Sequence, residues 1–270
     1  MVTLLITTFG LSISQACRSL NLSRTVYHYR PDTTRDEPVI VALQAVAERY
    51  PQYAFPKLFQ VLRRQGHPWN HKRIHRIYCL LKLNFRRKGK QRLPVRNPSP
   101  LATPEALNQS WSVDFMHDAL VCGRRFRTFN VVDDFNREAL SIEIDLNLSA
   151  QRMVNVLDRI AGIRSCCAWI MVRNLSLALT EWAEKHAVKL EFIQPGKPTQ
   201  NAFIERFNRT YRTEILDFYL LRTLNEVREI TEKWLSEYNC ERPHESLNNM
   251  TPEEYRQHHY LAGISKNAWN

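Results

Sequence analysis

The sequence predicts an α/β domain preceded by a helical N-terminal region, and three observations carry this prediction. Up to about residue 88, apolar residues recur every three or four positions, which is typical of helices. From residue 111 to 146, short runs rich in β-branched and aromatic residues indicate strands. Helical and strand patterns then alternate, which favours a sheet covered by helices.

The first predicted unit comprises residues 1–36 and contains two short helices on either side of Leu20–Leu22. Ser12 and Ser23 stand where each could cap a helix, since their side chains accept hydrogen bonds from free backbone N–H groups. The pair has the form of a helix-turn-helix. A helical hairpin that makes no DNA contact would give the same pattern, so both interpretations stay open.

Residues 37–92 form the second predicted unit, with three helices whose apolar faces can share one core. Asn70 opens the third helix, and its first turn carries Lys72 and Arg73. Positive charge is unfavourable at a helix N-terminus but useful beside phosphate. We therefore predict that Lys72 and Arg73 bind nucleic acid; the alternative is three packed helices with solvated basic side chains.

Residues 93–109 are predicted to be a linker because they contain several prolines, few large apolar residues and no periodicity. The α/β domain then occupies residues 110–220. Its expected strands are 111–115, 125–132, 140–146 and 188–192, and its expected helices start at 149, at 177 and just before Glu205. Residues 221–258 are predicted to be a helical extension of this domain and residues 259–270 a tail.

Charge indicates a polyanionic partner. Lysine and arginine total 38 against 27 acidic residues, a formal charge of +11, and the sequence pI is about 9.5. The six cysteines form no Cys-x-x-Cys pair and no zinc-type cluster, which suits a reducing compartment. The sequence has no apolar run long enough for a membrane span and no signal peptide, so we expect a soluble cytoplasmic protein without a membrane partner.

The helix around Glu205 carries the main candidate site. Helical spacing places Asn201, Glu205, Arg209 and Arg212 along one stripe, and Lys197 precedes them in a Gly/Pro-containing loop. A carboxylate flanked by amide and guanidinium groups suits a magnesium ion beside a phosphodiester. Taken alone, the same stripe could be a solvated helix face with Glu/Arg pairs.

Four segments in order resemble the IS3 group of insertion-sequence transposases. They are residues 195–214, residues 111–116, residues 127–138, and a set near the C-terminus made of Tyr238–Asn239, Arg242–His244 and Met250–Pro252. The resemblance spans roughly residues 10–258 and implies a ribonuclease H-like core of the retroviral-integrase type. It also implies cleavage and transfer of double-stranded DNA at element ends with Mg²⁺, by a homo-oligomer associated with the bacterial nucleoid. We expect the chain to be the downstream-frame product of such an element.

In this superfamily two Asp and one Glu hold a pair of magnesium ions. Asp114 and Glu205 match the first and the last of these ligands. Asp133 and Asp134, in a predicted turn, are assigned a structural role instead. Counting back from Glu205 by the family's spacing reaches Trp169, and no Asp-Asn-Gly-Pro-Glu-Phe tract occurs in the chain. The second catalytic Asp is therefore predicted to be missing, with Trp169 in its place.

A shifted reading frame explains the loss. Read from the third base of the first codon, Trp169–Ile170 must spell GAT, an Asp codon, and Met171–Val172 must spell GGT, a Gly codon. With permitted codons elsewhere, the same shift across residues 167–175 encodes Arg-Met-Asp-Asn-Gly-Pro-Glu-Phe. We hypothesise two compensating frameshifts, one near residues 163–166 and one near 175–176. Two functions stay open: a DNA transposase, here a degenerate and catalytically impaired copy, or an inactive DNA-binding remnant that interferes with active copies.

Overall fold

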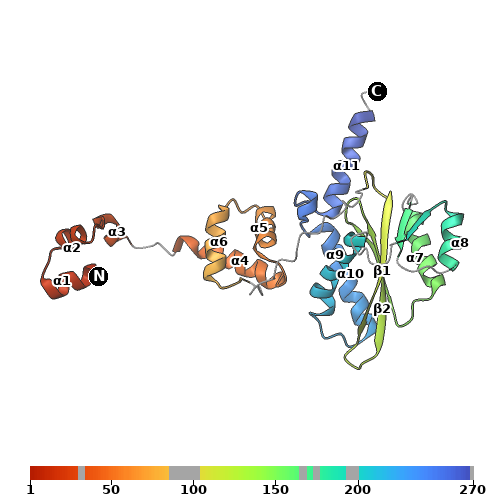
Figure 1. Ribbon diagram of the computed structural model, residues 1–270, viewed down its shortest axis with the longest axis horizontal. Coiled ribbons are helices and arrows are strands. Elements are labelled where there is room, and N and C mark those ends of the chain that lie inside the picture. Colours follow the sequence, from red (N-terminus) through yellow and green to blue (C-terminus); the bar gives the residue numbers. More distant parts are fainter. Residues whose placement is uncertain (30–33, 85–103, 164–168, 173–176, 193–200, 268–270) are drawn as a thin grey trace. The chain divides into compact units, whose positions relative to one another are not determined.

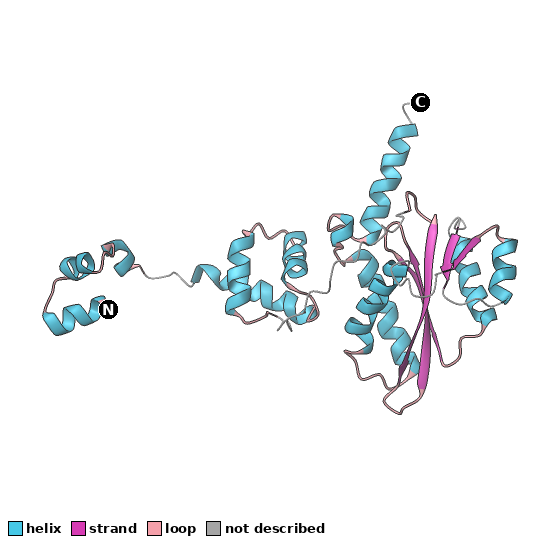
Figure 2. Cartoon of the chain, viewed as in Figure 1, coloured by secondary structure: helices cyan, strands magenta, loops and turns pink. Residues whose placement is uncertain are grey.

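The computed structural model describes the chain except for residues 30–33, 85–103, 164–168, 173–176, 193–200 and 268–270. It contains two compact units, Met1–Arg86 and Arg87–Asn270. The strands of the described residues all belong to the second unit, whereas the first is built of helices and loops (Figure 2). Most of the predicted linker, residues 93–103, lies outside the described residues.

Three short helices begin the first unit: α1 (Val2–Phe9), α2 (Ile13–Ser19) and α3 (Arg24–His28). Both predicted caps are confirmed, because the Ser12 side chain accepts from the Gln15 backbone N–H and the Ser23 side chain from that of Thr25. Helix α1 was not predicted. Its segment is rich in β-branched residues, which have low helix propensity, and it packs through Val2 with the buried Ala16 and Cys17.

Helices α4 (Glu37–Arg49), α5 (Phe55–Arg64) and α6 (His71–Leu80) form the three-helix module predicted for residues 37–92, after a short 3₁₀ turn, η1 (Thr34–Asp36). They share a core in which Leu43, Leu62 and Ile74 are fully buried. Asn70 caps α6 as expected, since its side chain accepts from the Lys72 N–H at 2.8 Å. Apolar residues that recur every three or four positions therefore indicated these three helices.

The second unit is built on one five-stranded sheet, in the order β3-β2-β1-β4-β5. The strands are β1 (Ser110–Ala119), β2 (Arg125–Asp133), β3 (Ala139–Asp145), β4 (Trp169–Val172) and β5 (Lys189–Phe192). The first three pair antiparallel, and β4 pairs parallel with both β1 and β5. Strand β4 was not predicted, because it is four residues long and shows no alternation.

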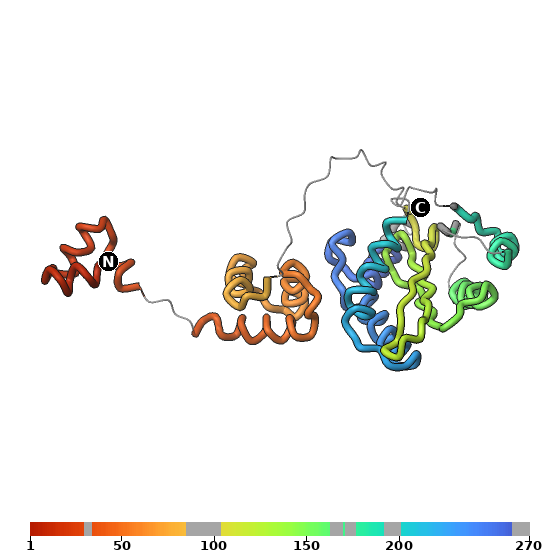
Figure 3. The backbone as a smooth tube through the Cα atoms, turned by 60° about the horizontal axis from the view of Figure 1, so that its bottom comes forward, coloured from red at the N-terminus to blue at the C-terminus, as the bar shows by residue number. Residues whose placement is uncertain are grey.

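Helices cover both faces of the sheet (Figures 1 and 3). Helices α7 (Ala150–Ile163) and α8 (Leu177–Lys185) pack on one face, in a core that includes Trp111, Leu157 and Trp182. Helices α9 (Ala202–Tyr211) and α10 (Leu224–Cys240) pack on the other, around Phe207 and Trp234. This is the ribonuclease H-like α/β architecture that the sequence predicted.

The C-terminal part continues the α9 layer. A π-helical turn, η3 (Arg212–Leu216), leads towards α10, which Thr223 and Glu226 start with a capping box. A short 3₁₀ turn, η4 (Glu245–Leu247), precedes α11 (Pro252–Asn267). None of the helices in the described ranges has the length and apolar character needed to cross a membrane.

Leu157 tests the packing of α7 against the sheet. It is fully buried, whereas Leu220 is 81% exposed. We expect Leu157→Ala to lower the free energy of unfolding by roughly 2–5 kcal/mol, because it removes buried methyl groups and leaves a cavity. Leu220→Ala, the matched control, should change it by less than about 0.5 kcal/mol. Urea unfolding followed by circular dichroism measures both, and equal losses would contradict this packing.

Candidate functional site

Asp114 lies in the middle of β1, on the sheet face that α9 covers. Side chains alternate between the two faces of a strand, and Trp111 and Val113 belong to the core beneath α7 and α8. Ser110, Ser112 and Asp114 therefore point to the opposite face. Directly across from Asp114 on β2 is Asn130, which is fully buried.

Asn208 of α9 joins these two strands. Its Nδ2 donates to Asp114 Oδ2 at 2.8 Å, and its Oδ1 accepts from Asn130 Nδ2 at 2.7 Å. Asn208 is itself only 8% exposed, so both hydrogen bonds lie at the base of the helix rather than in solvent. The amide thus aims one donor at the carboxylate and fixes α9 over the strand pair.

Glu205 stands one helical turn before Asn208. Residues three apart on a helix are surface neighbours, with Cβ atoms about 5–6 Å apart. The Glu205 side chain is exposed in the first turn of α9, whereas Asn201, the N-cap residue, is 4% exposed. Glu205 therefore lies one helical turn from Asn208, the residue that contacts Asp114.

The pairing of β1 with β4 locates Trp169. Ser110 pairs with Trp169 and Ser112 with Met171, so Trp169 lies level with a residue four positions before Asp114. At about 3.3 Å per residue, this is roughly 13 Å along the strand. The carboxyl end of β4, at Val172, is the end nearer to Asp114. The described part of β4, Trp-Ile-Met-Val, supplies no carboxylate.

The acidic turn after β2 has structural partners, in line with the role assigned to it. Asp134 is buried, and its carboxylate accepts from the hydroxyls of Ser110 at 2.7 Å and Ser112 at 2.6 Å. Asp133 accepts from the backbone N–H groups of Asn108 and Phe135, each at 2.8 Å. These bonds tie the turn to β1 and to the start of the domain.

The remaining predicted residues have different surroundings. Arg209 is exposed on α9, but Arg212 donates to Asp118 Oδ2 at 3.0 Å and to the His117 carbonyl at 2.9 Å. Lys197 lies outside the described residues.

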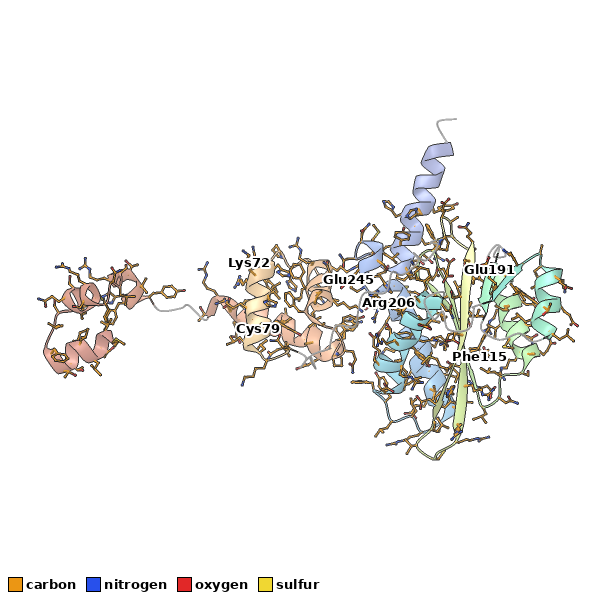
Figure 4. The ribbon with its side chains drawn as sticks, in the orientation of Figure 1. Lys72, Cys79, Phe115, Glu191, Arg206 and Glu245 are labelled. Carbon is orange, nitrogen blue, oxygen red and sulfur yellow. The ribbon has the colours of Figure 1, made fainter. Side chains whose placement is uncertain are left out.

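Lys72 and Arg73 belong to the other unit, on α6, and Figure 4 labels Lys72 there. Lys72 is exposed, whereas Arg73 donates to Asp36 Oδ1 at 3.0 Å and to the Arg35 carbonyl. Lys72 is therefore better placed than Arg73 to meet a ligand in solution.

Asn208 is a site residue that sequence reasoning missed. A neutral amide on an amphipathic helix has no distinctive pattern. Its position three residues after Glu205, on the same helix face, was the available clue.

The carboxylates of the described residues do not gather into a metal-binding group. Among the described residues, no group of three or more His, Cys, Asp or Glu side chains could hold a metal ion. Asp114 and Glu205 offer hard oxygen donors of the kind magnesium prefers. A two-metal centre needs a further carboxylate between them, and the residues described here do not provide it.

Comparison with known proteins finds family matches within both units. A family model described as "Integrase core domain" matches residues 186–252, and one described as "HTH-like domain" matches residues 34–91. The "Insertion element IS407 uncharacterized 31.7 kDa protein" of Burkholderia multivorans is 37% identical over 255 residues, which cover 93% of this chain and 92% of that protein. The "Insertion element IS476 uncharacterized 39.2 kDa protein" of Xanthomonas euvesicatoria is 33% identical over 91% of this chain and 72% of its own length.

A solved structure agrees on the fold. A chain of the simian T-cell lymphotropic virus intasome superposes with a TM-score of 0.50 at 15% identity, covering 80% of this chain and 74% of that one. The sheet order, the helical layers and this likeness define a ribonuclease H-like core of the integrase type. With the two family matches and the insertion-element relatives, the chain belongs to the IS3-group insertion-sequence transposases.

Asp134 yields a prediction about pH. Burial raises the pKa of its carboxyl from 3.8 to about 6, although the hydroxyls of Ser112 and Ser110 oppose this. Between these two pKa values the folded state holds a proton that the unfolded chain has released. This group therefore makes the fold less stable as pH rises through that window.

Between pH 4 and pH 7, the titration of Asp134 should lower the free energy of unfolding by roughly 2–3 kcal/mol, since one pKa unit corresponds to about 1.4 kcal/mol. We expect Asp134→Asn to abolish this decrease. Urea unfolding of both proteins at the two pH values gives this difference. Asn155→Ala, at an exposed amide that does not titrate, is the control and should keep the pH dependence of the unmodified chain. An Asp134→Asn protein with the same dependence would show that Asp134 does not titrate in this window.

Proposed function

We propose that this chain binds the DNA of an insertion element as a transposase does, but lacks the complete carboxylate set needed to cut it. The observation that supports this most directly is the site itself. Asn208 brings Asp114 and the Glu205 helix together, while no acidic residue occurs between Asp158 and Glu181 in the sequence. Two expected positions for the missing ligand fall within this interval. One is residue 169, from the family's spacing, and the other is the position level with Asp114 in the pairing of β4 with β1.

The two remaining carboxylates, those of Asp114 and Glu205, determine the metal chemistry that we propose. When bound, divalent metal ions in this family activate the attacking oxygen and stabilise the leaving one. Here Asp114 and Glu205 would each supply carboxylate oxygens to such an ion, and Mg²⁺ is the ion we propose. A tryptophan side chain has no oxygen atom that could coordinate magnesium. Loss of one of three ligands should lower cleavage by several orders of magnitude.

DNA binding does not depend on the missing ligand. The net charge of +11 favours a polyanion, and exposed Lys72 and Arg209 lie on α6 and α9. We propose that α6 contacts DNA phosphates and that Arg209, with Lys197, contacts them near the candidate site. Arg212 supports this surface indirectly, because its guanidinium holds Asp118. Assembly with further copies of the transposase on DNA is part of the same proposal.

An active transposase is the second candidate. The observation that favours it is the intact core: β1, β2 and α9 pack as a catalytic domain requires, and Asp114 retains its amide partner. A third ligand from another part of the chain would be needed for catalysis. A cleavage assay separates the two candidates.

For that assay, the unmodified chain is compared with a variant whose residues 167–174 are replaced by Arg-Met-Asp-Asn-Gly-Pro-Glu-Phe. We expect no cleavage or strand transfer on element-end DNA with Mg²⁺ from the unmodified chain, and clear cleavage from the restored variant. Trp169→Asp alone is the matched control and should stay inactive, because it restores the carboxylate without the Asn-Gly-Pro-Glu-Phe that follows it in the family tract. Cleavage by the unmodified chain would refute the proposal.

A substitution of Lys72 tests the proposal that α6 contacts DNA phosphates. Lys72→Ala should weaken binding to duplex DNA about three- to tenfold at low salt and reduce the slope of log K against log salt by about one, because one phosphate contact is lost. Lys189→Ala removes the same charge from a lysine that pairs with Glu191 at 3.1 Å and serves as control. Fluorescence anisotropy at several salt concentrations measures both. Equal slopes for the two variants would exclude Lys72 from the interface.

A further inference from the structure

Besides its apolar packing, α9 makes two contacts that flank Glu205 in the sequence. One is the Asn208 amide, between Asp114 and Asn130. The other lies before Glu205, where the Arg137 guanidinium carbon stands 3.4 Å from the centre of the Phe203 ring. Phe203 and Asn208 lie on either side of Glu205 in the sequence, two and three residues away.

The Asn208 side chain makes two directional hydrogen bonds. An amide can donate and accept at once, and here both capacities are used in a buried place where an unmade hydrogen bond would be costly. Asn130, which completes the chain of three groups, lies directly opposite Asp114 in the strand pairing. A shift of α9 along the sheet would break both bonds together, so the pair fixes the register of the helix against β1 and β2.

The Arg137 contact has its own backbone support. Arg137 adopts a left-handed conformation, with φ of 61°, which costs energy for a residue with a side chain. Its guanidinium donates to the Asp134 carbonyl and stacks on Phe203. Asp134 is bound in turn to Ser110 and Ser112 of β1. The acidic turn therefore connects β1 with the first turn of α9.

We propose that Asn208 and Arg137 are positioning residues that clamp α9 on both sides of Glu205 and so hold this carboxylate at a fixed place beside Asp114. The inference rests on the proposed function in one respect, namely that Asp114 and Glu205 are the remaining carboxylates of the site. It assigns a task to the acidic turn, which supplies no ligand of its own: Asp134 orients Arg137, and Arg137 orients the helix.

The first experiment uses the unmodified chain and needs no catalysis. Asn208→Ala removes the amide, and Arg137→Lys keeps the charge but loses the flat stacking surface. Hydrogen exchange measured by mass spectrometry across residues 202–211 should become about tenfold faster in both variants, because a loosened helix opens more often. Asn155→Ala and Arg159→Lys change an exposed asparagine and an exposed arginine of α7, and should leave α9 unchanged.

The second experiment places the same substitutions in the variant with the restored tract. A positioning role predicts that kcat for end cleavage falls about 10- to 100-fold, the range found when partners of metal ligands are removed. KM for DNA should stay within about twofold, since DNA binding is untouched. A role limited to stability would lower the thermal midpoint and leave kcat of the folded protein unchanged.

The outcomes are separable. Unchanged rates of hydrogen exchange across α9 in both variants would overturn the clamp, whether or not the restored protein cleaves DNA. Faster exchange together with reduced kcat supports it. Faster exchange with an unaltered kcat in an active restored protein would overturn the positioning role. If the restored protein is inactive, that result counts against the proposed function, and the exchange measurement on the unmodified chain decides the clamp.

Discussion

The packing of α9 across β1 and β2 is the constraint on which the domain and its site both depend. It buries Ile204, Phe207 and Tyr211 against the sheet and the C-terminal helices, and this apolar contact supplies most of the stabilisation. The polar groups beneath it are few and directional. Apolar packing is non-directional, whereas the Asn208 hydrogen bonds require one alignment of α9 with Asp114 and Asn130. Burial thus supplies the stability of the helix, and the two amides add directional hydrogen bonds between it and the strands.

Much of the fold could be predicted from the sequence, because the patterns are local. The three long strands are runs of seven to ten residues that contain β-branched and aromatic residues, and the helix α7 has an apolar face. Two elements were missed for physical reasons. Helix α1 contradicts its own propensity and depends on contacts with α2. Strand β4 is short, and its place in the sheet comes from pairing with strands more than ten residues away in sequence.

The site was predictable where chemistry and pattern coincide. Asp114 is a carboxylate on a core strand and Glu205 an acid within a basic helix, and both stand out on the page. Partners distant in sequence were not predictable. The pair of Arg212 with Asp118 and the contact of Asn208 with Asp114 each join positions 94 residues apart. Asp134 was recognised as structural from its turn, but its two serine partners and its raised pKa require the fold.

Strand β4 shows how unequal the demands of folding and of chemistry are. A strand pairs through its backbone, which every residue other than proline carries complete, so an apolar tetrapeptide of almost any origin can fill a slot between two neighbours. Trp169–Val172 does so, in parallel with β1 and β5. A metal ligand has no such substitutes. A change of sequence that keeps the strand but loses a carboxylate would leave the architecture in place and remove one metal ligand. The fold of such a domain is therefore no guide to whether its reaction survives.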